Sequence, residues 1–98
     1  MRLRYRRSAI EDLGEIRAYI ARDNPRAVKR FVAGLRARCR LLADQPHIGR
    51  ERPDIRPGLR SLPIQNYVVF YRLVDDTVEV VSIVHGSRDV DALFDEKP

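Results

Sequence analysis

Arginine and histidine are the residue types in this sequence best suited to chemistry on an anionic substrate. Arginine offers a planar fork of donors that fits phosphate and carboxylate groups, and histidine titrates near neutral pH. Arg60, Arg72 and His85 fall in or beside predicted strands, where their side chains could converge. Such a set could cleave a phosphodiester without a metal, because arginines stabilise developing negative charge. Alternatively, the arginines form solvated ion pairs and His85 makes a hydrogen bond at a strand end.

The sequence offers little for other kinds of catalytic or cofactor site. His47 and His85 lack cysteine or acidic neighbours at the spacing of metal ligands, so we expect no metal site. Cys39 is the single cysteine, which excludes an internal disulfide and suits a buried apolar position. No glycine-rich phosphate loop is present, and no serine stands in a nucleophile motif. We therefore expect no cofactor.

Length and hydropathy restrict the class of protein. The 98 residues, of which 44% are hydrophobic, suffice for one compact domain, which we place at residues 1–98. No apolar run approaches the ~18 residues that span a bilayer. No apolar stretch of secretory length follows the basic N-terminus. We therefore expect no membrane association and a reducing cytoplasm.

Charge is distributed unevenly along the chain. Residues 1–60 hold 16 Lys and Arg against 7 Asp and Glu, whereas residues 61–98 hold 3 against 7. All the basic residues except Lys29 and Lys97 are arginine. This basic front half indicates a polyanionic partner, either a nucleic acid or an acidic protein segment, unless the charges only form a salt-bridged surface.

The first half of the chain predicts a short strand followed by a helical hairpin over residues 9–43. Leu3 and Tyr5 alternate with arginines, as in a strand with one apolar face. Ser8 to Glu11 has the pattern of a capping box with Ser8 as the N-cap. Apolar residues then recur at helical spacing in two stretches separated by Asn24-Pro25. The first stretch contains Ile10, Leu13, Ile16, Tyr19 and Ile20, and the second contains Val28, Phe31, Val32, Leu35, Cys39 and Leu42.

The second half predicts a loop, three strands and a tail. Residues 46–58 are basic and rich in proline and glycine, which indicates a loop. The runs 59–64, 67–73 and 78–84 are separated by short turns, so we expect an antiparallel meander over residues 59–85. The C-terminal tail is residues 86–98, in which Arg88 to Phe94 form a short helix or stay irregular.

These elements predict an α+β fold of order β-α-α-β-β-β. A helical hairpin must pack on one face of a small curved, mainly antiparallel sheet, because both have an apolar face to bury. The middle and last strands are apolar almost throughout, which a sheet with one solvated face would not require. We infer that a partner chain covers part of the second face; the alternative is that sheet twist and the C-terminal segment cover it.

Five fragments, in this order along the chain, resemble the RelE/ParE superfamily of toxins from bacterial type II toxin–antitoxin systems. The resemblance extends over residues 3–94 and implies the fold expected above. It is carried by Asn24-Pro25-Arg26-Ala27, the stretches 46–50, 55–60 and 66–72, and Val84-His85-Gly86-Ser87-Arg88-Asp89 together with the order of elements.

The superfamily has two functional branches. In the ParE branch the toxin poisons DNA gyrase and has no catalytic residues, and in the RelE branch it cleaves mRNA in the ribosome. The chain looks more like ParE, because its helices are joined through Asn24-Pro25 and no tyrosine follows Tyr71. The resemblance then implies a gyrase inhibitor whose target contact includes Arg88, Asp89 and Phe94. The alternative is a ribosome-dependent endoribonuclease that uses Arg60, Arg72 and His85.

The resemblance also implies a protein partner in the bacterial cytoplasm. In this family an antitoxin of the ParD kind forms a hetero-oligomer with the toxin, and its acidic, initially disordered tail folds over the toxin surface. Such a tail would suit the arginine-rich front half and the surplus apolar surface. The residues expected to contact it are Tyr19, Arg30, Arg36, Arg40, Arg56 and Tyr71.

Overall fold

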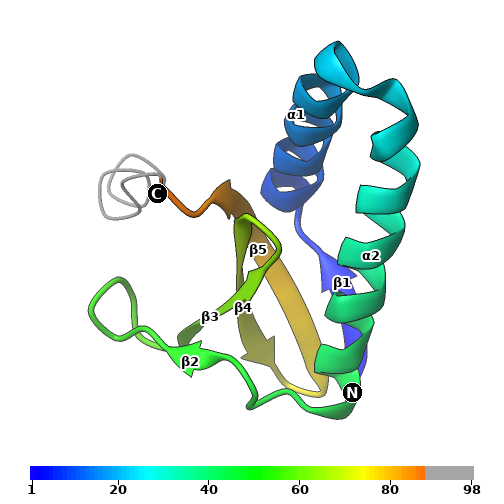
Figure 1. Cartoon of the computed structure of the whole chain (residues 1–98). Coiled ribbons are helices and arrows are strands. Elements are labelled where there is room, and N and C mark those ends of the chain that lie inside the picture. The colour runs from blue at the N-terminus through cyan, green and yellow to red at the C-terminus, as the bar shows by residue number, and fades with distance from the viewer. Residues whose placement is uncertain (88–98) are drawn as a thin grey trace.

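The computed structural model describes residues 1–87 and consists of a helical hairpin beside one five-stranded sheet (Figure 1). The strand order is β1-β5-β4-β3-β2. All neighbouring strands pair antiparallel except β1 and β5, which are parallel. The predicted α+β class and the β-α-α-β-β-β order are confirmed, apart from one additional short strand. The elements are β1 (Arg2–Tyr5), α1 (Arg7–Asp23), α2 (Pro25–Asp44), β2 (Arg50–Glu51), β3 (Leu59–Ile64), β4 (Tyr67–Val74) and β5 (Thr77–His85).

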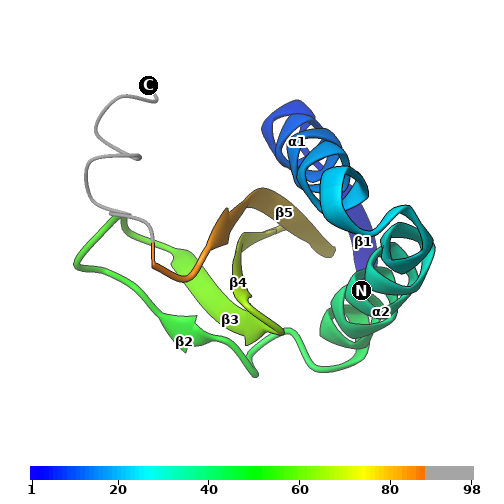
Figure 2. The ribbon, with the colours of Figure 1, turned by 45° about the horizontal axis from the view of Figure 1, so that its top comes forward.

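The two helices pack on one face of the sheet, chiefly against β1 and β5. In Figure 2 the hairpin lies beside these strands, while β3 and β2 curve away from it. Helix α1 buries Ala9, Leu13 and Ile16. Helix α2 buries four of the six residues of its predicted stripe, Phe31, Leu35, Cys39 and Leu42, while Val28 and Val32 are partly buried. Most of these side chains form one core with Val69, Val80 and Ile83 of the sheet.

Two residues of the predicted stripe on α1 are exposed. Ile10 and Tyr19 retain 59% and 63% of their accessible surface. The buried face of α1 follows residues 9, 13 and 16 instead. Successive residues of a helix point about 100° apart, so Ile10 points away from the face that Ala9 buries. Tyr19 is therefore free to line a surface groove, described below.

The predicted capping role of Ser8 is wrong, because α1 begins at Arg7, two residues earlier than a cap at Ser8 requires. Arg6 occupies the N-cap and makes no capping bond through its side chain. The hydroxyl of Ser8 instead donates a 2.6 Å hydrogen bond to the carbonyl oxygen of Val81 in β5. The short polar side chain thus serves a tertiary contact rather than its own helix.

That contact belongs to a β-bulge in β5. Phe70 and Tyr71 of β4 pair with Ser82 and Val80, so Val81 is an extra residue in the ladder. One carboxylate oxygen of Asp12 on α1 accepts hydrogen bonds from the Ser82 hydroxyl at 2.7 Å and from the amide of Ile83 at 3.0 Å. Helix α1 therefore satisfies backbone groups where the bulge disturbs the ladder.

The face of the sheet away from the helices has its own apolar cluster. Leu59, Phe70 and Val84 are buried there, and Ile55 of the loop between β2 and β3 packs against them together with Val68 and Val81. The first three are thus buried within the chain itself, and the other three are partly buried. The apolar character of the middle and last strands therefore does not require a partner chain on this half of the face.

Candidate functional site

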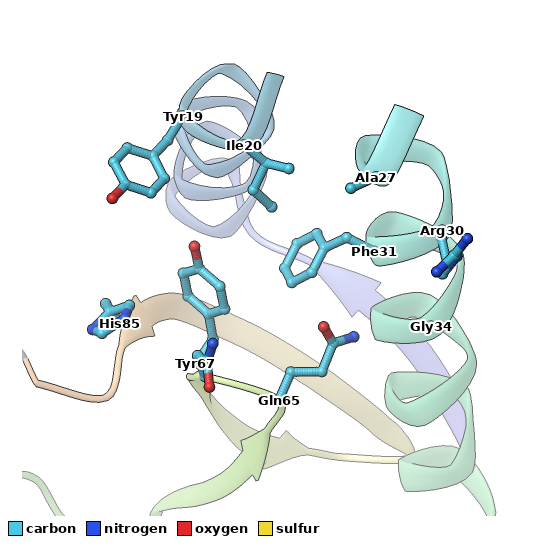
Figure 3. Close-up of a pocket in the computed structure, with 10 residues that line it drawn as sticks. Tyr19, Ile20, Ala27, Arg30, Phe31, Gly34, Gln65, Tyr67 and His85 are labelled. Atoms are coloured by element: carbon cyan, nitrogen blue, oxygen red, sulfur yellow. The ribbon is translucent and has the colours of Figure 1, made fainter. Parts of the chain in front are cut away.

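A groove of about 630 Å³ lies where the helical hairpin meets the end of the sheet. We call it the hairpin groove. Figure 3 shows side chains from both helices and from the sheet converging on it. It is lined by Tyr19 and Ile20 of α1, Ala27, Arg30, Phe31 and Gly34 of α2, and Gln65, Asn66, Tyr67 and His85 at the ends of the strands.

Aromatic rings form one wall of the hairpin groove. Tyr67 contacts Phe31 edge-to-face at a centroid distance of 5.3 Å and His85 at 5.5 Å. Burial raises the pKa of Tyr67, and the nearby Tyr19 adds to this effect. The phenol of Tyr67 therefore stays protonated at neutral pH and can donate a hydrogen bond.

The polar groups of the hairpin groove suit an acceptor-rich ligand. Arg30 is exposed and cationic, and the amides of Gln65 and Asn66 lie at the turn between β3 and β4. None of the described lining residues is a carboxylate. An apolar wall combined with donors and one cation fits a peptide that presents apolar and acidic side chains.

A second groove of about 530 Å³ lies between the helices on the surface of the hairpin. We call it the outer groove. Val28 and Val32 contribute apolar surface, while Arg17, Lys29 and Arg36 contribute three cations. No carboxylate is among the described residues that line the outer groove, so all of its charged side chains are cationic and favour an anionic partner.

Four of the six residues expected to contact an antitoxin lie on the helices. Tyr19 and Arg30 line the hairpin groove, Arg36 lines the outer groove, and Arg40 is exposed further along α2. Arg56 is partly buried in the loop between β2 and β3. The structure thus distributes these positions over two different grooves of the hairpin, the exposed end of α2 and a separate loop.

Tyr71, the sixth expected contact, has no exposed surface in the structure. Its hydroxyl accepts a 2.8 Å hydrogen bond from the amide of Gly49 and donates one of 2.8 Å to the carbonyl oxygen of Pro46. The prediction of a partner contact is therefore wrong for this conformation. Tyr71 instead holds the loop that leads from α2 to β2.

The alternative catalytic set does not converge. Arg60 pairs with Tyr71 on the helix side of the sheet and donates to the carbonyl oxygen of Gly49 at 2.8 Å. Arg72 lies on the opposite face, because successive side chains alternate. His85 pairs with Tyr67, five residues from Arg72 along β4, which corresponds to about 17 Å.

Arg72 is engaged in an ion-pair network rather than in a catalytic site. Its Nε donates to Glu79 at 2.6 Å, and Arg4 binds the other oxygen of the same carboxylate at 2.7 Å. Burial acts to raise the pKa of Glu79, but the hydrogen bonds from Arg72 and Arg4 outweigh it and leave that pKa below its usual value. His85 accepts or donates a 2.7 Å hydrogen bond with Ser87, depending on its tautomer.

The remaining sequence predictions concern metals, membranes and the tail. Among residues 1–87 no three histidine, cysteine or acidic side chains lie close enough to hold a metal ion. In the same range no helix is long and apolar enough to cross a membrane. Arg88, Asp89 and Phe94, the expected target contacts, lie outside the described residues.

Comparison with known proteins identifies a family. Residues 3–90 match the family model described as "ParE toxin of type II toxin-antitoxin system, parDE". "Toxin ParE1" of Mycobacterium tuberculosis is 42% identical over 50 residues, which are 50% of this chain and 51% of the relative. The match therefore spans only about half the length of that relative. "Putative toxin Y4kP" of Sinorhizobium fredii is 35% identical over 89 residues, which are 89% of this chain and 90% of the relative.

A solved structure has the same fold. The match is to a chain from the "Chromosomal ParDE TA system from P. aeruginosa", with a TM-score of 0.77. The sequences are 22% identical, and the match covers 87% of this chain and 95% of the other. At this level of identity the likeness supports the arrangement of helices and strands.

Proposed function

The chain belongs to the ParE family of toxins of type II toxin–antitoxin systems, and we propose that it halts growth by inhibiting DNA gyrase until an antitoxin neutralises it. The observation that carries this proposal is the family match over residues 3–90. The separation of Arg60, Arg72 and His85 favours a target-binding poison over the alternative ribonuclease.

The target can be tested with the purified chain. We expect it to inhibit supercoiling by gyrase in vitro and to cause cleaved gyrase–DNA complexes to accumulate. Full gyrase activity at a large excess of the chain would contradict the proposal. Intact mRNA in growth-arrested cells is expected, and codon-positioned cuts that disappear in His85→Ala would support the ribonuclease instead.

The resemblance to ParE assigns the target contact to the C-terminal tail, and we retain this as part of the proposal. Arg88→Ala and Phe94→Ala should then weaken gyrase inhibition while antitoxin binding is unchanged. A loss of antitoxin binding without a loss of gyrase inhibition would reverse that assignment.

The proposed antitoxin segment is acidic and occupies the hairpin groove, with its charges extending toward the outer groove. The support is the combination of apolar walls with cations and the absence of carboxylates among the described lining residues of both grooves. Electrostatic attraction to Arg30 and Arg36 would accelerate capture, and salt would reduce this effect.

The antitoxin encoded in the same operon provides the test. Tyr19→Ala and Arg30→Gln should each weaken its binding about tenfold or more, since aromatic and arginine anchors dominate protein interfaces. Arg38→Gln is the matched control, because Arg38 is an exposed arginine of α2 that lines neither groove. Equal effects of Arg30→Gln and Arg38→Gln would exclude the hairpin groove as the specific site.

A further inference from the structure

The face of the sheet away from the helices carries an excess of positive charge. Strand pairing places Arg4 and Arg72 on either side of Glu79, Arg2 opposite Thr77, and Arg50 opposite Ser61. Arg6 continues the alternation of Arg2 and Arg4, and its amide donates to Val80 in β5. We call these five arginines the arginine face.

A single carboxylate offsets the arginine face. Among the described strand residues, Glu79 is the only acidic side chain on this side of the sheet, because Glu51 pairs with Arg60 on the other side. The side chain of Glu79 is 6% exposed, whereas those of Arg4 and Arg72 are 56% and 48% exposed. Solvent and any partner therefore meet guanidinium groups and not the carboxylate.

Glu79 also fixes the two arginines that flank it. Arg4 donates to one carboxylate oxygen through Nε at 3.1 Å and Nη2 at 2.7 Å, and Arg72 donates to the other through Nε at 2.6 Å. Holding each guanidinium by one edge reduces the conformational entropy that it would lose on binding an anion. This arrangement prepares both groups for a second, external oxyanion.

The arginines are spread over an area rather than gathered at one point. Alternate residues of β1 are about 6.7 Å apart, and β1 and β4 are separated by two strand spacings, about 9.6 Å. A single small anion could meet only part of this surface. A polymer with regularly spaced charges could contact several of the arginines together.

The surroundings favour a nucleic-acid duplex over a peptide or a single strand. The apolar side chains of this face are buried, as Phe70 is, or partly buried in their own cluster, so they present little surface that could anchor a peptide. Of the described aromatic residues, Phe70 is the one on this face, and it is not exposed for stacking on unpaired bases. Phosphate contacts need neither feature.

We propose that the arginine face binds the phosphate backbone of duplex DNA without reading its sequence. This activity goes beyond the proposed inhibition of gyrase and does not depend on it. A protein that acts on a DNA-bound enzyme would gain a second point of attachment from such a contact. Neutralisation of about four phosphates predicts weak, strongly salt-dependent binding.

Fluorescence anisotropy with a labelled duplex of mixed sequence, about 20 base pairs long, tests the proposal on the purified full chain. Four phosphate contacts predict a roughly 100-fold loss of affinity between 50 and 200 mM salt. A labelled single strand and polyglutamate serve as competing probes. Both should bind more weakly than the duplex.

Two double variants separate this face from general basicity. Arg2→Gln with Arg6→Gln leaves the Glu79 network intact and should weaken duplex binding about tenfold or more. The slope of the logarithm of the binding constant against the logarithm of the salt concentration should become shallower by about two. Arg17→Gln with Arg36→Gln removes the same charge from the outer groove and should leave binding nearly unchanged. Circular dichroism of both variants verifies that they are folded.

Three results would overturn the proposal: no duplex binding at 50 mM salt, equal losses in the two double variants, or tighter binding of polyglutamate or the single strand than of the duplex. None of them bears on the gyrase assay, so the two proposals stand or fall separately.

Discussion

Replacing Tyr71 with phenylalanine removes one hydroxyl group and should destabilise the protein by about 2–3 kcal/mol. The hydroxyl bonds the amide of Gly49 and the carbonyl oxygen of Pro46, each at 2.8 Å. Gly49 is buried, so its amide would lose its partner away from water, which costs about 1–3 kcal/mol. The lost bond to Pro46 adds roughly 0.5–1.5 kcal/mol, part of which water recovers. The phenylalanine ring keeps the packing, so no cavity contributes.

Urea unfolding measures this loss. With a denaturant slope of about 1–1.5 kcal/mol/M, the midpoint should fall by roughly 2 M while the slope stays constant. The matched control is Tyr67→Phe, because the Tyr67 ring is partly exposed in the hairpin groove. We expect that variant to change stability by no more than about 0.5 kcal/mol.

Hydrogen exchange provides an independent reading of the same bond. The amide of Gly49 should be protected in the unmodified protein and exchange rapidly in Tyr71→Phe. If both tyrosine variants unfold at the same urea concentration, or if the Gly49 amide stays protected, the loop is held by something other than this hydroxyl.

Three further predictions concern other buried contacts. Asp12→Ala should lower stability by about 2–3 kcal/mol in urea unfolding, because the Ser82 hydroxyl and the Ile83 amide at the β-bulge lose their acceptor. Its control is Glu15→Ala at an exposed position of α1, which should change stability by less than about 0.5 kcal/mol. The pKa of Glu79 is lowered in the folded protein, so the contribution of this carboxylate to stability is complete above its unfolded pKa and disappears as the pH falls through its folded pKa. The variant Glu79→Gln should therefore lose less stability on acidification than the unmodified protein, in unfolding curves measured from about pH 5 to pH 2. An unchanged pH profile would contradict this prediction. Gly49→Ala should lower the thermal midpoint by several degrees, because a Cβ there would overlap the ring of Tyr71, and a wild-type midpoint would show that the loop shifts without cost.

Local patterns were sufficient to predict the succession of elements, because each helix buries a regularly spaced apolar stripe and each strand of the meander is a run of strand-forming residues between short turns. The stripe of α2 was correct in all four buried positions. The error on α1 arose because Ile10 and Ala9 are both apolar, and only packing decides which of the two faces the sheet.

Contacts between distant segments could not be read from the sequence. Ser8 matched a capping pattern, yet its hydroxyl binds Val81, 73 positions away. The bulge at Val81 and the parallel pairing of β1 with β5 depend on tertiary register, for which no local residue pattern is specific.

The candidate site was predictable in composition more than in geometry. The excess of arginine over lysine indicated an anionic partner, and Tyr19 and Arg30 do line one groove. Which arginines share a surface depends on strand register and alternation, and the pairing of Arg60 with Tyr71 places Arg60 on the opposite face from Arg72. Tyr71 was misassigned because a tyrosine in a strand suits either a surface contact or a buried hydroxyl with distant partners.

The parallel pairing of β1 with β5 has a consequence for how the molecule is made. Arg2 lies opposite Thr77, so the first strand to leave the ribosome has no neighbour in the sheet until the last one has been synthesised. Helix α1 likewise packs against β5, which is synthesised after both helices. The hairpin groove, which includes His85, and the network of Arg4, Arg72 and Glu79 on the arginine face are therefore complete only after residues 77–85 have been synthesised.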